Sequence, residues 1–369
     1  MESTFDLNRP VLETLVRHGA DINATDNQGH TPLMYATGLV VPMPREPLQA
    51  ERSRDVISDR DIIFRETVIR SLILGGAVVD ARNIEGETAL FGASRRSYYE
   101  IARLLLENGA DVNTRNKNGR TPLFEACQNI FEDVIKLLIE HGADVNVRDV
   151  TGQTPLLKAA GGLEKCTTIW QKDAATSANS STRYRDWCNT MQIIDVNTGT
   201  NFIVNLLIKN GANVDAADDL GKTLLMEAIL LGDTSTSILL LELGANVNLA
   251  DEYGWTPTMH AAMTGQSSVL RWLLQKGAAV NGIDQSGCTP LHHATRGGHK
   301  DIVQLLISSG ADINRRSNAG FTPHMIASEN RHFSVTKLLF DNGALHEDPL
   351  VKSVPSLGNV TLRAHDTGG

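Results

Sequence analysis

The chain has 369 residues, with 43 acidic and 34 basic side chains and a formal net charge of −9. Binding to a phosphate backbone or an anionic membrane needs a basic surface, so this charge argues against nucleic acid as a partner. Only four cysteines are present and none forms a C-x-x-C pair, which argues against a disulfide framework and a zinc ribbon.

The N-terminus lacks the basic segment and apolar run of a secretory signal, so we expect a chain that is not secreted. No stretch of about 18 apolar residues occurs, and we expect no membrane insertion. Together these features predict a cytoplasmic or nuclear protein. No phosphate-binding loop, dinucleotide fingerprint or common hydrolase signature is present, and we expect no cofactor.

Internal repetition dominates the sequence. The pair Gly-Ala recurs from Gly19 to Gly343, mostly at intervals of 33 residues, and a Gly two residues before Thr recurs with the same spacing. Two intervals are longer, at 57 and 69 residues, and each fits one repeat that carries an insertion. Because one unit of this size cannot bury its own apolar face, the units are predicted to stack on one another.

Each repeat is predicted to hold two helices. Thr-Pro starts the first helix, where Thr caps free amides and Pro loses no hydrogen bond, as at residues 121–122, 154–155, 256–257, 289–290 and 322–323. The second helix carries an apolar pair and ends at the Gly of Gly-Ala, which suits a left-handed cap. A short extended segment then leads to a tight turn.

This pattern resembles the ankyrin repeat over about residues 11–345, most closely from Asp284 to Ile313. The resemblance implies an all-α fold, an ankyrin-repeat solenoid of stacked helix-turn-helix units with short β-turn fingers. We expect one solenoid over residues 1–346 and a disordered tail over 347–369. A half-repeat precedes eight repeats, which begin at Asp26, Asn83, Asn116, Asp149, Asp218, Asp251, Asp284 and Ser317.

Two insertions, at about 38–61 and 162–197, interrupt the same turn between the first and second helix of a repeat. The first has the prolines and charges of a solvated loop and is predicted to end in a helix. The second has a polar centre flanked by Trp170, Tyr184 and Trp187, so we expect its flanks to pack on the solenoid. Tolerated loop growth and a functional role both remain open for it.

The family resemblance implies a scaffold or adaptor that recognises a protein partner through its concave groove. The residue just before the Ala of each first helix, which we call the slot, is ionisable in five successive repeats. The ends of the first helices add basic side chains, and the finger tips add aromatic ones. A solvated polar groove without a partner is the plainer interpretation. The predicted partner-binding residues are Tyr253, Trp255, Phe321, Glu125, Lys158, Glu227, His260, His293, Arg95, Arg96 and Arg296.

An unusual enzyme or small-molecule binder is the alternative. Its pocket would lie in the concave face of repeats four to seven, covered by residues 162–197, with Glu227, His260 and His293 as catalytic groups. Equivalent residues of stacked repeats lie about 10 Å apart, which argues against direct proton transfer between them. We also expect no metal site, because His292 and His299 fit capping and turn positions better than zinc ligation.

Overall fold

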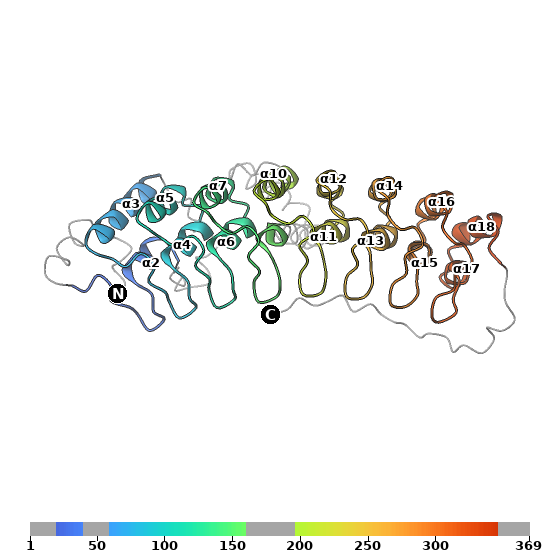
Figure 1. Ribbon diagram of the computed structural model, residues 1–369, viewed down its shortest axis with the longest axis horizontal. Coiled ribbons are helices and arrows are strands. Elements are labelled where there is room, and N and C mark those ends of the chain that lie inside the picture. The colour runs from blue at the N-terminus through green and yellow to red at the C-terminus, as the bar shows by residue number, and fades with distance from the viewer. Residues whose placement is uncertain (1–19, 40–58, 160–195, 346–369) are drawn as a thin grey trace, which may run out of the picture. The chain divides into compact units, whose positions relative to one another are not determined.

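The computed structural model describes residues 20–39, 59–159 and 196–345 (Figure 1). Contacts divide the chain into two compact units, Met1–Asn246 and Val247–Gly369, and each is described by itself. The predicted insertions lie largely outside the described residues, and the predicted tail lies entirely outside them. A single solenoid over residues 1–346 stays a prediction.

The first unit consists of helix pairs joined by finger loops. In each pair a short first helix lies beside the fingers, and an outer helix returns above it (Figure 1). Helix α3 starts inside the range predicted as the first insertion, and α10 starts inside the second. The helices are α2 (Pro32–Ala36), α3 (Asp59–Leu74), α4 (Ala89–Arg95), α5 (Tyr99–Glu107), α6 (Pro122–Gln128), α7 (Glu132–Glu140), α10 (Val196–Lys209), α11 (Leu224–Leu230) and α12 (Thr234–Glu242).

The second unit holds three helix pairs of the same kind. First helices α13, α15 and α17 contact one another in succession, as do outer helices α14, α16 and α18. Within the described ranges of the chain, regular structure is helical, apart from one isolated bridge between Ala217 and Thr223. The helices are α13 (Pro257–Thr264), α14 (Ser267–Gln275), α15 (Pro290–Gly297), α16 (Lys300–Ser308), α17 (Pro323–Glu329) and α18 (Phe333–Asp341).

The helices begin and end where the sequence predicts. Helices α6, α13, α15 and α17 start at the Pro of Thr-Pro, with Thr in extended backbone at the N-cap. At the other end of each outer helix, Gly takes a left-handed φ, for example +87° at Gly109 and +89° at Gly310. The all-α stack of helix pairs is therefore confirmed.

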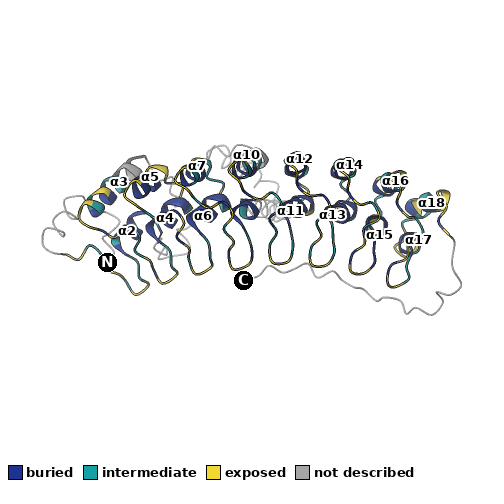
Figure 2. Cartoon of the chain, in the orientation of Figure 1, coloured by how far each residue is buried: buried dark blue, intermediate teal, exposed yellow. Residues whose placement is uncertain are grey.

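The core lies between the first and outer helices. Its small residues allow close approach, and Ala126, Ala261 and Ala294 are fully buried. In Figure 2 the buried residues concentrate on the helices, whereas exposed residues gather on the fingers. Helix α12 forms despite its polar start, because the Asp233 side chain accepts from the Thr236 amide and caps it.

Asparagine side chains fasten each repeat to the next. In the second unit, the Asn281 amide donates to the Gly310 carbonyl at 3.0 Å and accepts from the Asp312 amide at 2.8 Å. The same two-way contact is made by Asn23, Asn113, Asn146, Asn248 and Asn314. We call this contact the asparagine clip.

Two positions in the first unit carry Asp in place of the clip Asn. Asp80 accepts from the Asp111 amide at 3.0 Å, and Asp215 accepts from the Asn246 amide at 2.8 Å. A carboxylate has no N–H, so neither residue can donate to the glycine carbonyl of the next repeat. These two junctions therefore keep one half of the clip.

Candidate functional site

The candidate site is built on two fingers of the second unit, residues 251–255 and 284–288. Asp251 Oδ1 accepts from the amides of Tyr253 (2.9 Å) and Trp255 (2.8 Å). In the next finger, Asp284 Oδ1 accepts from the amides of Ser286 and Cys288 in the same way. Each carboxylate thus fixes its own turn, as expected of an Asp that bonds backbone two residues on.

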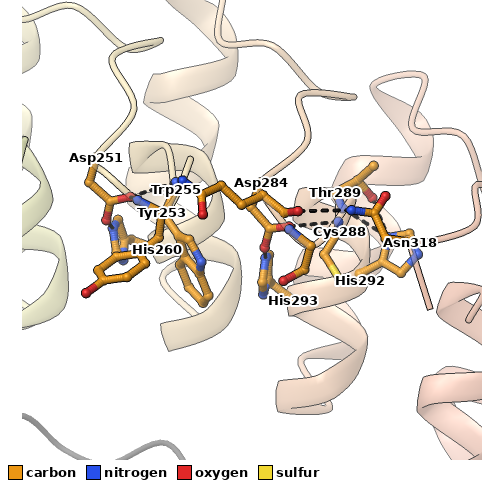
Figure 3. A network of polar contacts seen from close by, with 12 residues as sticks. Asp251, Tyr253, Trp255, His260, Asp284, Cys288, Thr289, His292, His293 and Asn318 are labelled. Carbon is orange, nitrogen blue, oxygen red and sulfur yellow. Dashed lines mark hydrogen bonds and ion pairs between the residues drawn. The ribbon is translucent and has the colours of Figure 1, made fainter.

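The second oxygen of each carboxylate faces a histidine of the following first helix. Asp284 Oδ2 lies 3.0 Å from His293 Nε2, and Asp251 Oδ2 lies 3.7 Å from His260 Nε2 (Figure 3). In the first unit Tyr35 occupies the same slot as these histidines, and its hydroxyl donates to Asp26 Oδ2 at 2.6 Å. The slot residue therefore braces the finger that precedes it.

Trp255 joins these two braced fingers. Its ring centroid lies 5.2 Å from that of His260 and 4.1 Å from that of His293, with the rings tilted (Figure 3). Both histidines are buried, since only 6% of the surface of His260 and 1% of that of His293 is exposed, whereas Trp255 is half-buried. Tyr253, two residues before it, is 47% exposed.

Burial and hydrogen bonding set the ionisation of this cluster. Burial lowers the pKa of His293 and outweighs the opposing contact with Asp284. Burial alone would raise the pKa of Asp284, but the His293 contact and the amide donors hold it below its ordinary value, and Asp251 behaves likewise. A neutral His293 donates from Nε2 to Asp284, which leaves Nδ1 without a partner among the described residues.

His292 and His299 have structural partners. The Thr289 amide donates to His292 Nδ1 at 3.0 Å, and His292 Nε2 donates to the Phe321 carbonyl at 3.1 Å. Burial lowers the pKa of His292 to about 4, so the ring stays neutral. His299 Nε2 donates to the Met263 carbonyl at 2.9 Å, which ties its turn to the preceding repeat.

The predicted site residues of the first unit are mostly engaged in ion pairs. Arg95 bridges Glu87 (2.6 Å) and Glu125 (3.0 Å), and Glu227 pairs with Lys222 at 3.4 Å. Arg96 is exposed and Lys158 is half-buried.

Three of the predicted partner-binding residues, Glu125, His260 and His293, have little exposed surface. They are buried because the slot points at the neighbouring finger or helix, where Glu125 meets Arg95 and His293 meets Asp284. His260 Nε2 lies 3.7 Å from Asp251 and forms no hydrogen bond with a described residue. His260 and His293 both lie against the ring of Trp255, and their predicted catalytic role stays a prediction. Arg296 is exposed and Phe321 is half-buried, as surface contact would require.

The bracing carboxylates Asp251 and Asp284 were missed by sequence reasoning. A signal for them exists, since each lies nine residues before its slot histidine, and Asp26 lies nine before Tyr35. Cys288, in the second of these fingers, is buried.

Across the described ranges, no helix is long and apolar enough to cross a membrane. Residues 20–39, 59–159 and 196–345 also contain no group of three or more His, Cys, Asp or Glu that could hold a metal ion.

The comparisons with known proteins agree with this architecture. A family model for ankyrin repeats in several copies matches residues 109–178, 191–284 and 277–349, and a model for the single ankyrin repeat matches residues 85–117. No curated protein gives a significant match to the chain. Ankyrin repeats generally mediate protein–protein interaction. Because the matched segments cover more than half of its length, the chain belongs to the ankyrin-repeat family.

Proposed function

We propose that the chain is a scaffold or adaptor that docks a protein partner on the finger side of its second unit. Tyr253 and the exposed edge of Trp255 are the anchors, and Arg296 and Phe321 in the following repeats are further contacts. The mechanism is rigid docking, with little change of the backbone.

One observation carries this proposal: an exposed Tyr stands next to a Trp whose ring is fixed before any partner arrives. Asp251 holds both backbone amides of that finger, and the His293 ring lies 4.1 Å from the indole. Tyr and Trp dominate binding energy at interfaces. Side chains that are already ordered lose less entropy on binding.

In this proposal His260 and His293 act on the partner indirectly. They hold Trp255 and the finger carboxylates in place, and their burial favours bracing over proton transfer. Glu125 braces Arg95 in the same sense. The proposed contacts in the first unit are the predicted residues that are exposed or half-buried there, namely Arg96, Arg95, Lys158 and Glu227.

The proposal places the protein in the cytoplasm or the nucleus. Cys127 and Cys288 are buried free thiols, which supports a reducing compartment. Burial raises the pKa of both thiols, so neither is a thiolate at neutral pH.

The test compares partner capture by three forms of the full chain: unmodified, Tyr253→Ala and Tyr99→Ala. Tyr99 is the matched control, since it is 38% exposed on outer helix α5, away from the fingers. We expect Tyr253→Ala to weaken the binding of at least one captured protein by more than about 1 kcal/mol, roughly fivefold in affinity. Tyr99→Ala should retain that protein. Equal capture by all three forms contradicts the proposal.

A further inference from the structure

Outer helices α10 and α12 differ from their neighbours in the residues that they show to solvent. We compare the outward slot, six residues before the Gly that ends each outer helix. In α5 and α7 this slot holds Arg103 and Lys136, in ion pairs with Glu100 (2.6 Å) and Glu132 (3.2 Å). In the other described outer helices it holds Arg70 (α3), Asn205 (α10), Ile238 (α12), Arg271 (α14), Gln304 (α16) and Lys337 (α18).

A groove lies between α10 and α12. Its volume is about 470 Å³, and its apolar wall is formed by Phe202, Ile238 and Leu239. Phe202 is 40% exposed, and the equivalent position in the preceding outer helix, α7, is Asp133. A partly exposed aromatic ring therefore stands where the neighbouring repeat has a charge.

The N-terminal end of the groove is closed by side chains. The Asn201 amide donates to the Ser235 hydroxyl at 2.7 Å, and the Thr236 hydroxyl donates to Asn201 Oδ1 at 2.8 Å. These bonds satisfy the polar groups at that end. Unsatisfied polar groups are found further along the groove.

Two acceptors in the lining lack a partner among the described residues. Asn205 Oδ1 is buried without a hydrogen bond, which is costly in an apolar setting. Glu242, at the C-terminal end, forms no ion pair with any described residue. The described residues that line the groove include no Lys or Arg, although Lys136 lies over the ring of Phe202. The groove thus offers acceptors and negative charge, but no donor of its own beyond Asn and Ser.

The ring of Phe202 also attracts positive charge. Lys136 Nζ already lies 4.8 Å from the centroid of Phe202, so one cation is bound at this ring. A lysine or arginine stem can lie along apolar side chains while its charged head reaches an acceptor. All these features are complementary to a basic side chain.

We propose that the α10–α12 groove binds a linear segment of a partner protein through a Lys or Arg next to an apolar residue. The stem of the basic residue lies on Ile238 and Leu239, and its head donates to Asn205 Oδ1 and Glu242. The apolar neighbour contacts the part of the Phe202 ring that stays exposed beside Lys136. This surface is formed by outer helices of the first unit, so it is independent of the finger-side docking proposed above.

The probe is a library of random linear dodecapeptides displayed on phage, selected on the immobilised full chain and counter-selected on Asn205→Lys. Asn205→Lys restores the residue type of the outward slot in α7 and places a cation where the peptide cation would lie. We expect the enriched peptides to carry Lys or Arg within a few positions of an apolar residue.

The enriched peptides are then synthesised, and their affinity is measured by fluorescence anisotropy. Asn205→Lys should weaken binding at least about tenfold, and Glu242→Gln about fivefold, since charged hydrogen bonds are the strong ones. Gln304→Lys also introduces a Lys in the outward slot, on α16, and Glu140→Gln on α7 matches Glu242→Gln. Both controls should bind as the unmodified chain does.

Three results overturn this proposal. The first is that no peptide discriminates between the unmodified chain and Asn205→Lys. The second is that enriched peptides lack basic residues or bind Glu242→Gln unchanged. The third is a dimer in solution that Asn205→Lys dissolves, which assigns the groove to a second copy of the chain. Thermal midpoints near that of the unmodified chain show that each variant is folded.

Discussion

The indole of Trp255 lies against the imidazole of His293, with ring centroids 4.1 Å apart, although the two residues belong to successive repeats. The finger aromatic is therefore part of the junction between two repeats as well as of the surface. This position differs from the sequence prediction of a Trp on a freely projecting tip.

Trp255→Ala is expected to destabilise the second unit. Removal of a half-buried ring that contacts two buried imidazoles should lower the free energy of unfolding by about 1–3 kcal/mol. Trp255→Phe should recover part of this loss, and Tyr253→Ala should change stability by less than about 0.5 kcal/mol. Urea unfolding followed by circular dichroism measures all three. An unchanged midpoint for Trp255→Ala would show that the stack adds nothing to the fold.

Stability is expected to fall as the pH is lowered from about 6.5 to 4. The pKa of His292 is about 4 in the folded chain and about 6.5 in an unfolded one, so below pH 6.5 the unfolded state takes up the proton first. The loss reaches up to about 3 kcal/mol at pH 4, and the lowered pKa of His293 adds to it in the same direction.

The matched variant for this pH dependence is His292→Gln. Gln also suits the third helical position of a capping box after Thr289, and it does not titrate. Its unfolding free energy, measured at several pH values, should decline less steeply between pH 6.5 and 4 than that of the unmodified chain. Identical slopes would exclude His292 as the source.

Asp80→Asn and Asp215→Asn are each expected to stabilise the first unit. The new amide can donate to the glycine carbonyl of the next repeat and so complete the asparagine clip. One added hydrogen bond contributes about 0.5–1.5 kcal/mol. The reverse change, Asn281→Asp, removes the 3.0 Å bond to Gly310 and should lower stability. Thermal unfolding of the three variants tests the sign, and a destabilised Asp215→Asn would contradict this account.

Arg331→Gly is expected to stabilise the last helix pair by about 1 kcal/mol. Arg331 has a left-handed φ of +59° in the turn before α18, a conformation that costs a non-glycine residue energy. The equivalent positions Gly232, Gly265 and Gly298 carry glycine. Arg331→Ala removes the same side chain but keeps the strain, so it should bring no gain. Hydrogen exchange of the α18 amides distinguishes the two variants.

The local structure of each repeat follows from its own residues. Thr-Pro sets the start of α15, and the Gly-Ala that follows sets the end of α16, because caps and turns depend on contacts within a few residues. The same holds for the finger turn at Asp284, whose carboxylate binds amides two and four residues on. The all-α stack could therefore be predicted from spacing alone.

By itself, then, the sequence determined the helix pairs, their period and the repeat family of this protein. Only the tertiary structure decided that His260 and His293 are buried braces, that Trp255 stacks between them, and that a groove lies between α10 and α12. The physical reason is that burial and ring stacking depend on the residue that the next repeat brings against a side chain. Equivalent slots share a backbone position but meet different neighbours, so one slot holds a paired Glu125 in one repeat and a buried His293 in another.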